Sequence, residues 1–230
     1  MGLTHSPSIV QDNLLFCLDA ANKRSYPGSG SNWYDISGNN RHGTPLSAPT
    51  YYSDNGGYLR IVGNSYSMGN ADPTGDFHLR QNWSYEVWVY ILGNNCGLLG
   101  NGIASGNQGL HVLWFASGTR ELIFGMYGND MDSYFGVDPV GKWSHFVFTY
   151  NHSSPYTKQL YYNGSLYNSK NGNQYAYTGT GIIQVGGTYS SQGGSNRANG
   201  YFSQARLYKK ILTPEEVRQN YLATKGRFNL

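Results

Sequence analysis

The stretch from Lys142 to Ser169 constrains the fold more than any other part of this 230-residue chain. Its first part, KWSHFVFTYN, is typical of a β-strand in which Trp143 lies on one face while Phe146 and Phe148 lie on the other. A strand that buries aromatic side chains on both faces cannot lie at the edge of a sheet. We therefore expect neighbouring strands on both sides of it and a second packed layer.

The second part of this stretch, KQLYYNGSLYNS, predicts a tight β-hairpin. Residues that favour strands flank the dipeptide Asn163-Gly164 on both sides. Asn and Gly tolerate the two positive φ angles of a type I′ turn better than other residue pairs. Two antiparallel strands should therefore meet at this dipeptide.

Composition favours one all-β domain. The chain has 31 glycines and 21 tyrosines but only 13% charged residues, which indicates many turns and an aromatic, weakly charged surface. Its length fits a single large β-sandwich. We predict an N-terminal segment over 1–11, of the kind that serves as an anchor, and one domain over 12–230 that includes a C-terminal helix.

That helix is predicted from about Pro214 to Thr224. Thr213 and Glu216 have the spacing of a capping box, in which each residue binds the backbone of the other. Val217 and Tyr221 lie four residues apart and would pack the helix against the sandwich.

Further runs rich in strand-forming residues are separated by Gly, Asn and Ser turns. They predict strands at 13–20, 58–68, 83–92, 97–100, 109–116, 120–127, 181–187 and 198–208. Within 58–68, Gly63 indicates a hairpin or a bulge. About a dozen antiparallel strands of this kind predict a two-sheet jelly-roll sandwich with a short C-terminal helix.

Seven segments, in their order along the chain, resemble the laminin-G-like branch of the concanavalin-A-like lectin and glucanase fold. They are LDAANKRSYPGSGSNWYDISGNNRHGT, YLRIVGNSYSMGN, NWSYEVWVY, KWSHFVFTYN, LYYNG, IIQVGG and YFSQARLYKKILTPEEVRQNY, and they cover about residues 12 to 224. The segments CLDAANKRSYPGSGSNW and EEVRQNYLATKGRFNL also resemble virion proteins of tailed bacteriophages, particularly large phages of aquatic bacteria. This second resemblance implies a virion protein, assembled in the host cytoplasm as a head decoration or fibre for host attachment.

Lectins, glucanases and lyases share the fold that the resemblance implies, so the site residues must separate binding from catalysis. Retaining glucanases need two carboxylates about 5 Å apart, whereas the comparable strand, YEVWVY, carries only Glu86. Glu86 matches a position that is common in non-catalytic laminin-G-like domains, which implies a structural hydrogen-bonding role. We interpret His111 and His145 as strand residues. The expectation is a protein without catalytic residues; a glycosidase or lyase is the alternative, which a second acid near Glu86 would support.

Calcium is a separate question, because several relatives of this fold hold it at the rim of the sandwich. Such a site needs six to eight oxygens, normally with two or more carboxylates. The loop that would correspond to the pentraxin site, 188–199, has no Asp or Glu. Asp72 and Asp76 are weak metal candidates, since a turn in which they bind their own backbone is favoured. We expect no cofactor, with calcium left open.

Carbohydrate is the expected ligand, because Tyr is combined with Asn, Gln, Ser and Gly in the predicted loops 50–58, 129–136, 171–179 and 188–201. Tyrosine offers a flat apolar face and a hydroxyl, while Asn and Gln pair with sugar hydroxyls. The candidate carbohydrate-binding residues are Tyr51, Tyr52, Tyr134, Tyr175, Tyr177, Tyr189, Asn196 and Arg197.

The formal net charge is +3 and the basic residues are scattered, which argues against nucleic acid as a partner. No run approaches the ~20 apolar residues of a membrane span, and the N-terminus lacks the pattern of a signal peptide.

Surface glycans and other virion proteins are the expected partners, and a homo-oligomer is left open. The alternative to glycan binding is a purely structural protein that binds other virion subunits. Cys17 and Cys96 are expected to be buried, with a disulfide left open.

Overall fold

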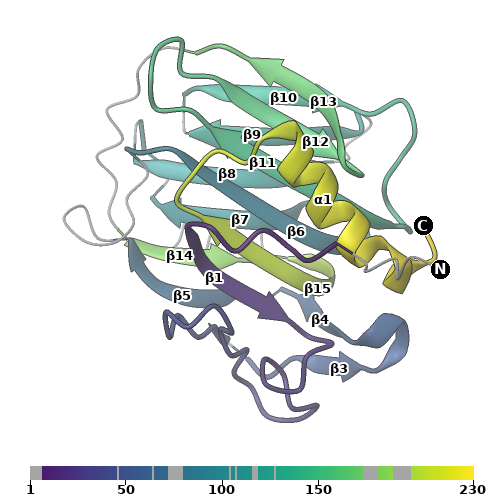
Figure 1. Cartoon of the computed structure of the whole chain (residues 1–230). Coiled ribbons are helices and arrows are strands. Elements are labelled where there is room, and N and C mark those ends of the chain that lie inside the picture. Colours follow the sequence, from purple (N-terminus) through teal and green to yellow (C-terminus); the bar gives the residue numbers. More distant parts are fainter. Residues whose placement is uncertain are drawn as a thin grey trace.

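The computed structural model describes residues 7–45, 47–63, 65–71, 80–103, 105–106, 108–115, 119–126, 128–172, 181–188 and 198–230. In this part of the chain, two antiparallel sheets pack face to face, and an α-helix lies across the outer face of the larger sheet (Figure 1). The predicted fold class is confirmed: an all-β, two-sheet jelly-roll sandwich of the concanavalin A-like kind with a short C-terminal helix.

The larger sheet has the strand order β13-β12-β11-β6-β15-β4-β3, with β1 also paired to β15. Strand β15 organises this sheet, because it pairs with β6 along one edge and shares its other edge between β4 and β1. The strands are β1 (Leu14–Asp19), β3 (Thr50–Tyr52), β4 (Tyr58–Val62), β6 (Trp83–Ile91), β11 (Trp143–Tyr150), β12 (Lys158–Tyr162), β13 (Ser165–Lys170) and β15 (Asn199–Tyr208).

The smaller sheet has the order β10-β9-β8-β7-β14-β5-β2. Its strands are β2 (Thr44–Pro45), β5 (Tyr66–Ala71), β7 (Cys96–Gly102), β8 (Gly109–Phe115), β9 (Glu121–Met126), β10 (Asp130–Tyr134) and β14 (Gly181–Val185).

Three local predictions need correction. The run 58–68 is neither a hairpin nor a bulged strand, because β4 and β5 belong to different sheets and the chain crosses between them at Gly63, whose φ is 62°. The predicted loop 129–136 contains the edge strand β10. The predicted loop 50–58 contains β3 and the 3-10 helix η1 (Asp54–Gly56).

The inner faces of the two sheets form one aromatic core. Trp33, Trp83 and Trp114 have no exposed surface. The ring of Phe124 in the smaller sheet meets the rings of Trp83 and Phe148 in the larger sheet edge to face, with centroids 5.5 and 5.6 Å apart. Strand β11 lies between β6 and β12 and is buried on both faces, which confirms the prediction that it is an interior strand.

The predicted hairpin is confirmed between β12 and β13. Asn163 and Gly164 have φ angles of 49° and 79°, the two positive values that a type I′ turn needs. A Cβ atom at position 164 would lie 2.8 Å from the ring of Tyr221. Glycine is therefore required here by the turn and by the helix that covers it.

The two edge strands β10 and β13 lie on the same side of the sandwich (Figure 1). Side chains of β13 bind the free backbone carbonyls of β10, which protects this edge from pairing with another chain. The donors and acceptors are Tyr167 Oη to Tyr134 O (2.7 Å), Asn168 Nδ2 to Asp132 O (3.1 Å) and Lys170 Nζ to Asp130 O (2.6 Å).

The C-terminal helix is confirmed as α1 (Pro214–Thr224), and the 3-10 helix η2 (Lys225–Phe228) follows it directly. The predicted capping box is present: Thr213 Oγ1 accepts from the Glu216 amide at 3.2 Å, and Glu216 Oε2 accepts from the Thr213 amide at 3.0 Å. The Val10 amide donates to Asn220 on this helix at 2.8 Å. The predicted division into a segment 1–11 and a domain 12–230 stays a prediction.

Two further findings concern the described residues. Cys17 and Cys96 are buried free thiols, and burial raises the pKa of Cys96 to about 12. Among the described residues, no helix is both long enough and apolar enough to span a bilayer.

We expect Gly164→Ala to lower the free energy of unfolding by about 2–4 kcal/mol, because a methyl group adds a steric conflict with Tyr221 to the strain of a positive φ. Gly30→Ala is the matched control: its φ is 90° but no atom lies within 4 Å, so it should cost about 1–2 kcal/mol. Urea unfolding followed by Trp fluorescence measures both. In a Tyr221→Ala background the cost of Gly164→Ala should fall towards the control value, because the ring is gone and only the Cβ atom of residue 221, 3.0 Å away, remains. An unchanged cost would refute the conflict with the Tyr221 ring.

Candidate functional site

Aromatic side chains from five adjacent strands gather on the outer face of the larger sheet. In a strand, successive side chains point to opposite faces. Leu59, Val89 and Phe202 point into the core, so their neighbours Tyr58, Tyr90 and Tyr201 point outward. We call the whole set the aromatic row: Tyr52 on β3, Tyr58 on β4, Tyr201 on β15, Tyr90 on β6 and Trp143 on β11.

The five rings of the row form one cluster, in which Tyr58 also lies 5.3 Å from Trp143. The centroids of Tyr52 and Tyr58 are 5.1 Å apart with nearly parallel planes, and Tyr58 lies 5.0 Å from Tyr201. Tyr90 is 5.5 Å from Tyr201 and 5.8 Å from Trp143. These spacings fall within the range of favourable aromatic pairs, so the rings support one another.

All five side chains of the row are partly exposed. Burial raises the pKa of Tyr58, and the Asp54 carboxylate and the neighbouring phenols of Tyr201, Tyr52 and Tyr90 raise it further. The Tyr58 hydroxyl is therefore protonated at neutral pH and can both donate and accept a hydrogen bond. Four phenol groups and one carboxylate thus gather on one surface.

This combination of groups determines what the row can bind. Partly exposed rings offer apolar contact, and phenol hydroxyls offer hydrogen bonds beside it. The side chains are already ordered by their mutual packing, so binding would cost little conformational entropy. A ligand with apolar C–H surface and many hydroxyls, such as a carbohydrate, matches these properties.

The three described members of the predicted binding set lie apart. Tyr52 belongs to the row. Tyr51, the next residue along β3, points to the opposite face, where its ring stacks on Tyr26 at 5.2 Å and packs against the main core. Tyr134 is 62% exposed at the end of β10, on the opposite side of the sandwich from β3 (Figure 1).

The other predicted residues, Tyr175, Tyr177, Tyr189, Asn196 and Arg197, lie outside the described residues, as do the metal candidates Asp72 and Asp76. They stay predictions. Among the residues that the structure does describe, no group of three His, Cys, Asp or Glu side chains could hold a metal ion.

The predicted binding set comes from loops and therefore lacks Tyr58, Tyr90, Tyr201 and Trp143. A signal for them was present. Each occupies an outward position in a predicted strand whose alternate residues are apolar and point inward. Aromatic residues at outward positions of several strands indicate a binding face when those strands are neighbours.

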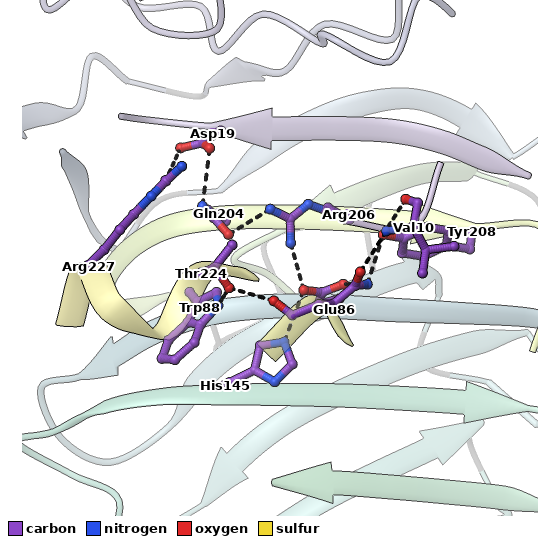
Figure 2. A network of polar contacts seen from close by, with 11 residues as sticks. Val10, Asp19, Glu86, Trp88, His145, Gln204, Arg206, Tyr208, Thr224 and Arg227 are labelled. Atoms are coloured by element: carbon purple, nitrogen blue, oxygen red, sulfur yellow. Dashed lines mark hydrogen bonds and ion pairs between the residues drawn. The ribbon is translucent and has the colours of Figure 1, made fainter. Parts of the chain in front are cut away.

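Beside the row, a buried polar network lies between the larger sheet and helix α1 (Figure 2). Glu86 is 1% exposed and accepts hydrogen bonds from Arg206 Nη1 and Asn220 Nδ2, both at 2.6 Å. Its Oε1 is also 3.0 Å from His145 Nε2. Glu86 therefore has the structural hydrogen-bonding role that the resemblance implies, and His145, like His111, is a strand residue.

The charge state of Glu86 follows from this environment. Burial by itself would raise the pKa of Glu86, but the Arg206 guanidinium and the His145 hydrogen bond outweigh it and lower the pKa to about 2. Glu86 is thus a carboxylate at any ordinary pH.

The network extends from Glu86 to the C-terminus of the chain. Arg206 Nη2 donates to Gln204 Oε1 at 2.7 Å, and Gln204 Nε2 donates to Asp19 Oδ2 at 3.1 Å. Arg227 Nη1 donates to the other Asp19 oxygen at 2.8 Å. These bonds fix η2, whose Phe228 lies 4.7 Å from Trp143 and closes one end of the aromatic row.

Comparisons with known proteins agree with the architecture. The family model described as the concanavalin A-like lectin/glucanases superfamily matches residues 63–218. Among curated proteins, none matches the chain significantly.

Several solved structures share the fold. Domain 4 of AbnA, a GH43 extracellular arabinanase from Geobacillus stearothermophilus in complex with arabinotriose, has a TM-score of 0.65 and 18% identity, over 92% of this chain and 98% of that chain. The binding domain of Paraclostridial Mosquitocidal Protein 1 has a TM-score of 0.61 and 16% identity, over 92% of this chain and 52% of that one. Trypanosoma rangeli sialidase has a TM-score of 0.66 and 17% identity, over 94% of this chain and 33% of that one. The chain thus spans about half the length of the toxin domain and a third of the sialidase, and these identities show the fold alone.

The pKa of Glu86 gives a prediction for stability against pH. Because folding lowers this pKa from 4.5 to about 2, its ionised form stabilises the fold above pH 4.5, by about 3 kcal/mol, and this stabilisation is lost as the pH falls from 4.5 towards 2. We expect Glu86→Gln to be about 3–5 kcal/mol less stable at pH 7, since Arg206 loses its buried partner. The difference from the unmodified protein should shrink steadily towards pH 2. A difference that stays constant between pH 5 and pH 2 in urea unfolding would contradict the assignment.

Proposed function

We propose that this chain, which belongs to the concanavalin A-like lectin/glucanases superfamily, is a non-enzymatic domain that binds carbohydrate through the aromatic row. The observation that carries the proposal is the contact series of five rings with phenol groups at one surface. The rings come from five adjacent strands. The rings of Tyr58 and Trp143 also meet, with centroids 5.3 Å apart, so the row forms one compact patch.

This compact shape supports a particular mode of binding. Rings that all lie so close to Tyr58 fit a short part of a glycan rather than an extended chain. Apolar faces of the sugar rings would contact the aromatic side chains, and their hydroxyls would pair with the phenols and with Asp54.

The comparisons support binding as the general role. One structure of this fold, domain 4 of an arabinanase, has been solved in complex with arabinotriose, and another is the binding domain of a toxin. The burial of Glu86 under α1 supports a non-catalytic domain, because its carboxylate is held by Arg206 and Asn220 and is 1% exposed.

The finer proposal places the domain on a phage particle. The resemblance of CLDAANKRSYPGSGSNW and EEVRQNYLATKGRFNL to virion proteins of tailed phages supports a head decoration or fibre, assembled in the host cytoplasm and displayed on the virion. There the row would attach the particle to carbohydrate of the host or its surroundings. Cryo-electron microscopy of the particle, with labelled antibody against this chain, tests the location.

A glycan array with purified protein, in calcium and in chelator, tests the binding function. For a glycan that binds, we expect Tyr52→Ser and Tyr58→Ser each to weaken affinity about tenfold, which corresponds to ~1.4 kcal/mol for one contact residue. Tyr134→Ser is the matched control, because it removes an exposed tyrosine on the opposite side of the sandwich. Thermal unfolding verifies that each variant is folded.

The outcomes separate the alternatives. Loss of binding in Tyr134→Ser but not in the row variants would reject the row as the site. Binding to no glycan in either condition would reject the carbohydrate function and favour a purely structural role among virion subunits.

A further inference from the structure

A cavity of about 340 Å³, widely open to solvent, lies in the loop that follows β1. Its lining residues are Arg24, Tyr34, Asp35, Ile36, Gly38 and His42. Sites for small ligands have volumes of roughly 300–1,000 Å³, so this cavity is large enough for one small ligand. It shares no residue with the aromatic row.

The loop that forms the cavity is fixed to the edge of β1. Asp35 Oδ1 accepts from the amides of Cys17 and Ser37 at 2.8 and 2.9 Å. Asp35 Oδ2 accepts from the Ser37 hydroxyl at 2.8 Å and the Arg41 amide at 3.1 Å. Asn39 Nδ2 also donates to two carbonyls of β1. The cavity is therefore preformed, and the charge of Asp35 is balanced by four donors of the protein.

Arg24 supplies an available positive charge. The side chain is exposed, and within the described part of the chain its guanidinium forms no ion pair and no hydrogen bond. By contrast, the guanidinium groups of Arg206 and Arg227 are paired with Glu86 and Asp19. A guanidinium has a planar set of donors that matches the two oxygens of a carboxylate.

The other lining groups complement this charge. His42 Nδ1 accepts a hydrogen bond from the Asp35 amide at 3.1 Å, so the proton of the neutral imidazole is on Nε2, which can donate to a ligand. The ring of Tyr34 is 38% exposed and contacts the His42 ring edge-on at 5.3 Å. Ile36 is half-buried and adds apolar surface.

We propose that this cavity binds a sugar unit that carries a carboxylate, such as a hexuronic acid. The Arg24 guanidinium would pair with the carboxylate, His42 Nε2–H would donate to a hydroxyl, and the ring of Tyr34 would contact the C–H face of the sugar. The site is independent of the aromatic row, so either can fail without the other.

Isothermal titration of the full chain with trigalacturonate at ~150 mM salt, where surface charges are screened, tests this site. The ligand controls are the methyl ester of the same trisaccharide and a trisaccharide that carries sulfate groups but no carboxylate. We expect trigalacturonate to bind at least tenfold more tightly than either control. Equal binding of the ester would refute recognition of the carboxylate, equal binding of the sulfated sugar would refute selectivity for it, and no heat at millimolar ligand would refute the site.

Variants locate the site. Arg24→Gln should weaken binding of trigalacturonate at least tenfold, and Arg24→Lys should recover only part of it because the planar donor set is lost. Lys23→Gln is the matched control, since it removes the adjacent cation, whose Nζ lies over the Tyr51 ring at 5.2 Å. It should retain binding within twofold, as should Tyr58→Ser in the row. Equal losses in Arg24→Gln and Lys23→Gln would mean general charge attraction and would overturn the proposal.

Discussion

The ion pair between Glu86 and Arg206 determines how the outer face of the larger sheet is covered. Removing two charges from water costs several kcal/mol for each ion unless further partners replace the lost hydration. Here Asn220 on α1, distant from Glu86 in the sequence, binds Glu86, and Gln204, two residues from Arg206 on β15, binds Arg206. Asn220 also accepts from the Val10 amide. The pair is thus linked through Asn220 to both the C-terminal helix and the segment before β1, and the helix makes a third layer on the sandwich (Figure 1).

The same network leaves the aromatic row uncovered. It ends at η2, which Arg227 fixes to Asp19, and Phe228 then contacts Trp143 at the end of the aromatic row. The row itself depends on strand register, since Tyr201 pairs with Tyr90 and Tyr90 pairs with Trp143 across the sheet. Both proposed sites are thus built from groups that are already held in place, the row by register and the cavity by Asp35. Preformed sites of this kind lose little entropy when they bind a ligand.

The sequence predicted well the features that depend only on residues close together in the chain. The Asn163-Gly164 turn and the capping box of α1 depend on neighbours in the chain, and both are confirmed. The crossing at Gly63 depends on which sheet each flanking strand joins, a choice made by pairing with remote strands. The outward aromatic positions are visible in the sequence, but their gathering into one row is not, for the same reason: Tyr52, Tyr90 and Tyr201 become neighbours only through the strand order. In contrast, a loop rich in tyrosine is visible at once, although Tyr51 in such a segment turns towards the core.

The position of Glu86 bears directly on whether binding or catalysis is the better proposal. A general acid in a glycosidase needs a raised pKa, so that it still holds a proton near neutral pH. The Arg206 guanidinium does the opposite and lowers the pKa of Glu86 to about 2. As a nucleophile the carboxylate would need access to the sugar, yet helix α1 covers it and Asn220 occupies one of its oxygens. The environment that makes Glu86 valuable to the fold removes the properties that catalysis would need, which favours a binding role for the aromatic row on this face.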